Sequence, residues 1–370
     1  MASFSDLLRV LDKKVPNEPT LFEFYLNVPL LEEFSGKKRA TDYDHTWNWE
    51  LIIPAYKRLG YGYATMLGSQ FHFPTNTVHQ KSTISLNEGV VITDRKSFQA
   101  YRWPEAKKED YSCLAKAEKI LDKDKKLIVW SNGGVLENVI SLVGYENLCF
   151  MLYEDRELAA DIFREVGERL FEYYVECLRY DAVGAVICND DWGFNSQTML
   201  SPNDLREFVF PYHKKIVAYA HKCGRPAILH SCGNLDEVYD DIIDDMKFDG
   251  KHSYQDVIEP VEEAYDKYHD RIAIIGGIDM DFVARKTPQE IEARAIAMLE
   301  KGRQGGYALG TGNSIPEYIP KENYLAMIGA LFRAKRKQRA AQGPQSVVFL
   351  HFLYNLRQKI IYVPAMLTLS

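Results

Sequence analysis

A short apolar strand leads directly into two potential metal ligands in the stretch Arg225-Pro226-Ala227-Ile228-Leu229-His230-Ser231-Cys232-Gly233-Asn234. Side chains two positions apart in an extended chain point to the same side, so His230 and Cys232 can approach one point. Imidazole nitrogen and thiolate sulfur are ligands that zinc prefers. In the alternative without a metal, His230 hydrogen-bonds a neighbour and Cys232 is a small buried hydrophobic residue. The stretch therefore predicts a buried strand followed by a candidate zinc site.

Composition excludes several classes of protein. The chain has 370 residues, of which 46% are hydrophobic, and a net charge of −7, which argues against a nucleic-acid or anionic-membrane partner. No apolar run is long enough to span a bilayer, and Met1–Pro19 lacks the apolar core of a signal peptide. The six cysteines form no C-x-x-C pair, which is typical of reduced thiols. We therefore expect a cytoplasmic, globular protein.

Short apolar runs without alternation recur along the chain, as in a parallel sheet that is buried on both faces. The predicted strands are Thr20–Leu26, Gly62–Met66, Lys126–Trp130, Val183–Cys188, Ala227–His230, Phe248–His252, Ile272–Ile275 and Tyr307–Leu309. Helical patterns alternate with these runs, and two of them begin with a cap and a proline, Ser201-Pro202 and Thr287-Pro288. The predicted helices are Trp47–Leu59, Ser112–Leu121, Asp155–Arg179, Pro202–Lys222, Leu235–Asp244, Glu259–Tyr268, Pro288–Lys301 and Lys321–Lys337.

Eight strands alternating with helices indicate a single (β/α)8 barrel of the TIM type, here expected over residues 1–340. An open doubly wound sheet is the alternative, although no G-x-G-x-x-G motif follows the first strand. An insertion after the second strand is expected to form a hairpin over the barrel mouth, with arms Ser82–Leu86 and Val90–Thr93. The tail, residues 341–370, is largely apolar and aromatic, and we assign it no function.

Polar residues follow most of the predicted strands, at the end where barrel enzymes place their active sites. The candidates for catalysis are Asp190, Asp191, His252 and Asp279, and those for substrate binding are Asn132, Trp192, Tyr254, Asn313 and Glu317. Asp190 and Asp191 are adjacent, so they cannot both face inward. Asp279 follows two glycines and has a simpler role as the cap of the next turn. His252 has the alternative of an ordinary surface histidine.

With these motifs, the chain resembles the uroporphyrinogen decarboxylase superfamily, and within it the corrinoid-dependent methyltransferases more than the true decarboxylases. The resemblance covers about Leu21 to Phe332 and implies a single barrel. The matching pieces are Leu136–Tyr153 with Val143-Gly144-Tyr145-Glu146-Asn147, Asp190–Phe210 with Leu200-Ser201-Pro202, His230-x-Cys232-Gly233, Gly276-Gly277-Ile278-Asp279, and Ile315-Pro316 through Glu322-Asn323.

Two departures from the resembled family oppose decarboxylation. The decarboxylases carry an arginine-rich loop after the first strand, which grips a substrate with many carboxylates, whereas Tyr25–Leu30 contains no arginine. They also carry an aspartate after the second strand that binds pyrrole NH groups, and here the sequence is Met66-Leu67-Gly68-Ser69. A cage for an octacarboxylate needs cations, so this mouth does not suit such a substrate.

The resemblance also bears on the metal. In the thiol methyltransferases of this superfamily a cysteine in the last Gly-rich loop completes the zinc site, and here Asn313 stands in its place. Zinc would then be held by His230 and Cys232 with a carboxylate or histidine from elsewhere. Without a metal, the site would bind an acceptor such as a folate through hydrogen bonds. We further expect a carboxylate such as Asp191 to accept a hydrogen bond from the second ring nitrogen of His230.

The resemblance implies methyl transfer between a corrinoid, carried on a separate small protein, and a small donor or acceptor such as a thiol, a folate or a methylated substrate. Without a metal, Asp190, Asp191 or His252 would act as the acid. One alternative is a lyase that decarboxylates a porphyrinogen. The other is a non-catalytic barrel that handles corrinoids.

Overall fold

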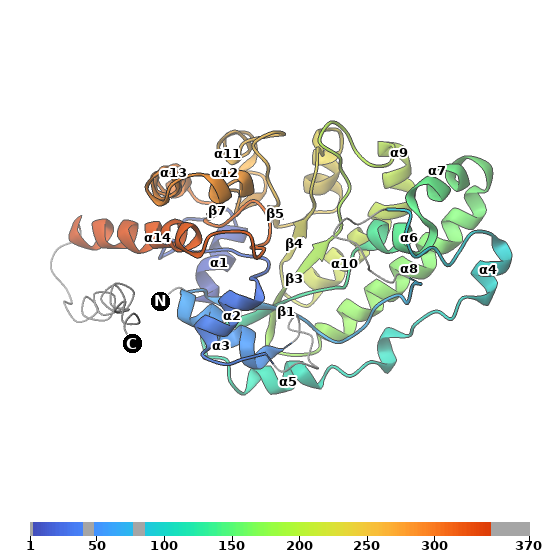
Figure 1. Ribbon diagram of the computed structural model, residues 1–370, viewed down its shortest axis with the longest axis horizontal. Helices are drawn as coiled ribbons and strands as arrows, with labels where there is room; N and C mark the ends of the chain where they lie inside the picture. Colours follow the sequence, from blue (N-terminus) through green and yellow to red (C-terminus); the bar gives the residue numbers. More distant parts are fainter. Residues whose placement is uncertain (1–2, 40–47, 77–85, 342–370) are drawn as a thin grey trace, which may run out of the picture.

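The computed structural model describes residues 3–39, 48–76 and 86–341, and within them the strands form one curled parallel sheet (Figure 1). Neighbouring strands follow the order of the sequence. The seven strands are β1 (Tyr63–Leu67), β2 (Lys126–Trp130), β3 (Val183–Asn189), β4 (Ala227–His230), β5 (Gly250–His252), β6 (Ala273–Ile275) and β7 (Tyr307–Ala308). Consecutive parallel pairing with helices between the strands confirms the α/β class and is typical of barrel-like folds.

The prediction of a first strand at Thr20–Leu26 is wrong. This segment forms only isolated parallel bridges, from Leu21 to Leu309 and from Leu26 to Ile315. On its other side it meets side chains of β1 instead of the β1 backbone: the Glu23 amide donates to the Tyr63 hydroxyl at 2.7 Å. Because side chains take up these backbone groups, no ladder of hydrogen bonds forms. The segment nevertheless lies between the edge strands β7 and β1.

The other predicted strands are confirmed, with shifts at their ends. All seven residues of β3 are buried, as expected for a strand that is covered on both faces. In the parallel register, Asn189 pairs with His230, and His230 pairs with His252. Three polar residues therefore stand side by side at the same edge of the sheet.

Helices surround the sheet (Figure 1). The α-helices are α1 (Phe4–Leu11), α2 (Val28–Ser35), α3 (Trp49–Leu59), α4 (Arg95–Ala100), α5 (Ser112–Glu118), α6 (Val135–Val143), α7 (Tyr145–Glu154), α8 (Arg156–Cys177), α9 (Pro202–Asp204), α10 (Phe210–Lys222), α11 (Val261–Tyr268), α12 (Met280–Arg285), α13 (Pro288–Lys301) and α14 (Lys321–Ala341). Both predicted caps are confirmed, because Ser201 accepts from the Asp204 amide and Thr287 accepts from the Glu290 amide.

Two predicted helices differ from the structure. The Pro202–Lys222 helix contains a π-helical segment, Leu205–Val209, between α9 and α10. The predicted helix Leu235–Asp244 is a 3₁₀ turn, Asp236–Val238, followed by a π turn, Asp241–Asp245. The Asn234 side chain accepts from the Asp236 amide at 3.0 Å, and this local turn replaces a regular helix start.

The predicted hairpin insertion is not present as such in the described residues. Residues 82–85 of its first arm lie outside them, and Val90–Thr93 has no strand structure. The amides of Val91 and Ile92 both donate to the Leu142 carbonyl, at 2.9 and 3.0 Å. The second arm therefore binds the end of α6 instead of a partner strand. The tail lies outside the described residues from 342 onward.

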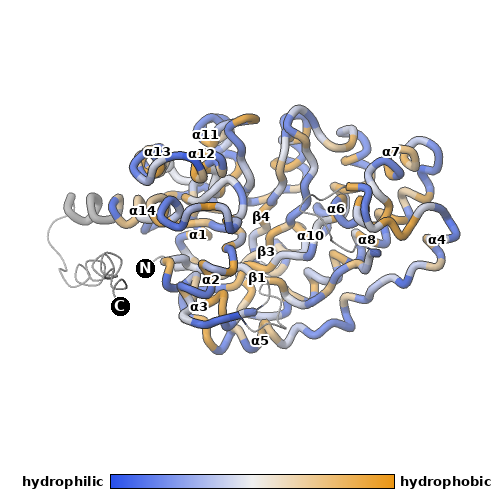
Figure 2. Tube along the Cα trace, viewed as in Figure 1, coloured by the Kyte–Doolittle hydropathy of each residue, from blue (hydrophilic) through white to orange (hydrophobic). Residues whose placement is uncertain are grey.

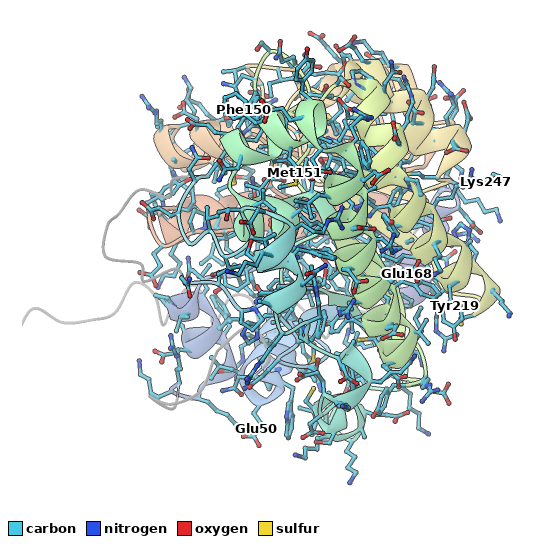
Figure 3. All side chains as sticks on the ribbon, turned by 90° about the vertical axis from the view of Figure 1, so that its right-hand side faces the viewer. Glu50, Phe150, Met151, Glu168, Tyr219 and Lys247 are labelled. Carbon is cyan, nitrogen blue, oxygen red and sulfur yellow. The ribbon has the colours of Figure 1, made fainter. Side chains whose placement is uncertain are left out.

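The core lies between the sheet and its helices. Figure 2 shows hydrophobic residues concentrated on the central strands and hydrophilic residues on the outer helices. Figure 3 shows α8 and α10 on the outer face, with Glu168 and Tyr219 labelled. Gly167 lets these helices approach, because a Cβ there would lie 2.2 Å from the Tyr212 ring.

No single described helix is long and apolar enough to cross a membrane. The bent pair α6 and α7, which meet at 95°, passes that test of length and composition only when taken together.

Candidate metal centre and substrate pocket

The ligand atoms of Asp191, His230 and Cys232 all lie within 4.8 Å of one another. His230 ends β4, Cys232 follows two residues later, and Asp191 lies two residues beyond the end of β3. The Cys232 sulfur is 3.9 Å from His230 Nε2, and the Cys232 amide donates to Asp191 Oδ1 at 2.8 Å. The predicted convergence of His230 and Cys232 is confirmed, and Asp191 is the carboxylate that joins them.

A chain of hydrogen bonds fixes the ring of His230. His252 Nε2 lies 3.1 Å from the Thr311 carbonyl, which can only accept, so this nitrogen carries hydrogen. In a neutral His252 the other nitrogen, Nδ1, is then an acceptor, and His230 Nδ1 lies 2.7 Å away and donates to it. The remaining nitrogen, His230 Nε2, keeps its lone pair and faces Cys232. This is the tautomer that a metal ligand requires.

Burial keeps both histidine rings neutral. It lowers the pKa of His230 to about 3, with a smaller effect from Lys251, and it holds the pKa of His252 well below its usual range, with a further effect from His230. The expectation that Asp191 accepts from the second nitrogen of His230 is wrong. His252 accepts that hydrogen bond, because the register of β4 and β5 places the two rings side by side.

The Cys232 sulfur has two polar side chains as neighbours. Asn313 Nδ2 donates to it at 3.3 Å, and the Ser253 hydroxyl lies 3.5 Å away. Burial, together with Asp191, raises the pKa of the thiol to about 12. Burial also raises the pKa of Asp191. Both groups would ionise far more readily beside a metal cation, so this donor set of nitrogen, sulfur and oxygen fits zinc.

Three of the predicted catalytic residues have positioning roles in this geometry. Asp190 is fully buried and accepts from the amides of Leu136 and Glu137 and from His213 Nε2 at 2.8 Å, so it holds the start of α6. Asp279 caps α12 by accepting from the Phe282 amide. His252 is also fully buried, and both of its ring nitrogens are hydrogen bonded. Asp191 is the predicted acid that faces the pocket.

Some of the predicted substrate-binding residues lie at the cavity or the ligand cluster, and others do not. Asn132 lines the pocket described below, and Asn313 contacts the Cys232 sulfur. Trp192 has no exposed surface, because it packs between Phe210 and His213, so the prediction that it contacts substrate is wrong. Tyr254 is buried, with its hydroxyl 3.2 Å from that of Tyr239, and Glu317 is exposed.

A cavity of about 860 Å³ opens beside this centre, and Asp191 forms part of its wall. Its other polar and apolar wall residues include Glu88, Glu137, Asn132, Asn138, Asn189, Phe73, Ile140, Phe194 and Met199. Within the described part of the chain, no arginine or lysine lines it. The wall therefore combines carboxylates and amides with apolar surface, and it suits a small neutral or cationic molecule.

Two acids at this end of the sheet were missed by sequence reasoning. Glu137 lines the cavity and bonds the Gly134 amide at 3.0 Å. Burial, then Asp191 and Asp190, raise its pKa well above the usual range. Glu23 is fully buried and accepts from the Thr311 amide, and burial raises its pKa to about 8. The sequence held a signal for each of them. Glu137 closely follows Gly133-Gly134, and Glu23 is the single acid in the apolar run Thr20–Leu26.

Comparison with known proteins agrees with this architecture. The family model described as Uroporphyrinogen decarboxylase (URO-D) matches residues 62–333. Uroporphyrinogen decarboxylases of Geobacter metallireducens and Anaeromyxobacter sp. are each 26% identical, over 190 and 197 residues. These matches cover 50% and 51% of this chain and 52% and 51% of the relatives, so the chain spans about half the length of the curated relatives it matches.

A solved structure of a methyltransferase from Methanosarcina mazei resembles the fold, with a TM-score of 0.64 and 18% sequence identity. The likeness covers 90% of this chain and 98% of that one. At 18% identity this likeness supports the barrel-like fold alone. The family is supported by the family model, which matches most of the chain. The chain belongs to the uroporphyrinogen decarboxylase family, a family of enzymes.

Proposed function

We propose that this chain is a methyltransferase that moves a methyl group between a corrinoid on a separate small protein and a small substrate. The observation that carries the proposal is the cluster of Asp191, His230 and Cys232, of which Asp191 also lines the cavity. Three protein ligands, with the fourth position left to water or substrate, are typical of catalytic zinc, and a cavity beside Asp191 would give a substrate access to such a metal. When bound, zinc would lower the pKa of a thiol substrate or polarise a heteroatom that carries the methyl group.

The residues around the cluster hold it in place. His252 fixes the ring of His230, and Asn313 donates to the Cys232 sulfur. Asn132 and Asn189 offer amide groups to a substrate in the cavity, and Phe73, Phe194 and Met199 provide apolar walls. Glu137 lines the cavity, and the rise in its pKa caused by burial suits it to donate a proton to a demethylated oxygen or nitrogen.

The charge of the cavity limits the substrate. Its described wall carries the carboxyl groups of Glu88, Glu137 and Asp191, together with the imidazole of His72, and no arginine or lysine. Anionic compounds are therefore disfavoured, and we infer a neutral or cationic methylated compound as the methyl donor. The same argument opposes the lyase, since a porphyrinogen with eight carboxylates needs a cationic cage. Family membership alone favours the lyase. The formed cluster opposes a non-catalytic barrel.

The proposal is tested with free cobalamin in place of the corrinoid protein. Zinc-loaded protein is mixed anaerobically with cob(I)alamin and a panel of neutral and cationic methyl donors, and methylcobalamin formation is followed by absorbance. Cys232→Ser is expected to reduce the rate about 100-fold or more. Cys149→Ser is the matched control, because Cys149 is exposed on α7, and it should leave the rate unchanged.

A Cys232→Ser rate equal to that of the wild type would remove the metal cluster from the reaction. Incubation with uroporphyrinogen should release no coproporphyrinogen. Steady turnover of uroporphyrinogen would establish the lyase instead.

A further inference from the structure

Glu23 is a buried acid between β7 and β1 for which the proposed reaction has no direct use. Its side chain has no exposed surface. Thr311 provides the hydrogen-bond partners of its carboxyl group among the described residues: the Thr311 amide lies 2.9 Å from Oε1, and the Thr311 hydroxyl lies 2.7 Å from Oε2. A carboxylate in such a place would be costly without a cation, so its protonation state matters.

A count of hydrogens decides that state. The Thr311 hydroxyl also lies 2.6 Å from the Asn313 carbonyl, and a carbonyl oxygen can only accept. The single hydroxyl hydrogen of Thr311 therefore points to Asn313. The short contact between Thr311 Oγ1 and Glu23 Oε2 then needs a hydrogen from Glu23. With the Thr311 hydrogen on the Asn313 carbonyl, Glu23 is assigned as a neutral carboxylic acid, whose hydroxyl donates to Thr311 Oγ1 and whose other oxygen accepts from the Thr311 amide.

Thr311 connects Glu23 to both sides of the metal centre. Its carbonyl accepts from His252 Nε2, and His252 orients His230. Its hydroxyl holds the Asn313 backbone, and the Asn313 side chain donates to the Cys232 sulfur. We infer that Glu23 is a positioning residue that, as a neutral acid, holds Thr311 and through it orients His252 and Asn313 against His230 and Cys232. The orientation of these side chains does not depend on the proposed function, whereas the metal and the reaction assigned to the site do.

The test compares Glu23→Gln with Glu23→Met in metal-free protein. A glutamine amide can donate to the Thr311 hydroxyl while its oxygen accepts from the Thr311 amide, so it can replace a neutral acid but not a carboxylate. Nitrogen-15 NMR of labelled histidines reports which ring nitrogen carries hydrogen. We expect Glu23→Gln to keep hydrogen on His252 Nε2 and His230 Nδ1. Glu23→Met should give a mixture of tautomers at both rings and alkylate several-fold faster at Cys232.

Thr311→Ser and Thr311→Val form a second pair that leaves Glu23 in place. The serine variant keeps the hydroxyl and should match the wild type, whereas the valine variant should behave like Glu23→Met. Leu170→Ala, at a buried position of α8, controls for general loss of stability. It should lower the melting temperature without changing the histidine signals.

Tautomer mixing in Glu23→Gln equal to that in Glu23→Met would show a carboxylate and overturn the inference. Wild-type signals in Glu23→Met would also overturn it. Zinc titration provides the separate readout for the proposed function, with a loss of about 10–100-fold in affinity expected for Glu23→Met. Wild-type protein that binds no zinc would contradict the proposed metal centre, while the histidine signals would still decide the role of Glu23.

Discussion

Two buried histidines, His213 in α10 and His230 at the end of β4, differ in what surrounds their two ring nitrogens. His213 Nε2 bonds Asp190 at 2.8 Å, and its Nδ1 is buried beside Trp192 without a partner among the described residues. His230 Nδ1 bonds His252 at 2.7 Å, and its Nε2 faces Cys232. In the first arrangement His213 and Asp190 form a buried pair with a structural role. The second leaves a lone pair directed at two further ligands, and this difference separates a core histidine from a candidate metal ligand.

The largest expected effect is on metal affinity. His230→Ala should weaken zinc binding about 1,000-fold, because one of three or four ligands carries a corresponding share of roughly 10–16 kcal/mol. His213→Ala should keep zinc affinity within about threefold as long as the protein is folded. Competition with a chromogenic chelator measures both variants. Equal losses in the two variants would erase the distinction between the histidines.

A second expected effect is a dependence of the free energy of unfolding on pH, caused by Glu23. Because burial raises the pKa of Glu23 to about 8, the folded protein binds more protons than the unfolded chain between about pH 4.5 and 8. The folded state is therefore destabilised by this group as pH rises through that range. Relative to Glu23→Gln, the wild type should lose about 3–4 kcal/mol of unfolding free energy between pH 5 and 8. Urea unfolding at several pH values measures this, and a constant difference would contradict the neutral acid.

The Asp190 pair should matter for stability instead. His213→Ala leaves Asp190 buried without its side-chain partner, so we expect a loss of about 3 kcal/mol in unfolding free energy. His230→Ala removes no partner of a buried charge and should cost less. Chemical denaturation of metal-free protein measures both. A larger loss for His230→Ala would reverse the assignment of structural and functional histidines.

The smallest expected effect is a gain. Asn313 donates to the Cys232 sulfur, so a cysteine at this position would place a second sulfur near the metal. A thiolate is a better zinc ligand than an amide, and Asn313→Cys should tighten zinc binding about 10-fold. Asn313→Ser serves as the control of similar size and should give no gain. Unchanged affinity in Asn313→Cys would place the metal elsewhere.

Sequence patterns predicted the parts of this account that depend on local spacing. The apolar run before His230 matches β4 at both ends, and the period of two in a strand correctly brought Cys232 to the same point. The adjacency rule also showed that only one of Asp190 and Asp191 faces inward, but it could not say which. That depends on where β3 ends and on the donors around each carboxylate.

The remaining features depend on contacts between distant segments. The partner of His230 follows from the register of β4 and β5, which no single stretch of sequence contains. Thr20–Leu26 has the composition of a strand, but side chains of β1 occupy its backbone groups. Trp192 follows a strand end as a substrate-binding residue would, and it is buried because α10 supplies an aromatic partner, Phe210.

The central claim is that His230 and Cys232 hold zinc together with an oxygen ligand from Asp191. X-ray absorption at the zinc edge of the zinc-loaded protein tests it most directly, because sulfur and nitrogen or oxygen shells differ in distance. We predict one sulfur at about 2.3 Å and the remaining nitrogen and oxygen ligands at about 2.0–2.2 Å, with the sulfur shell lost in Cys232→Ala. A zinc shell without sulfur in the wild type, or one unchanged by Cys232→Ala, would contradict the account.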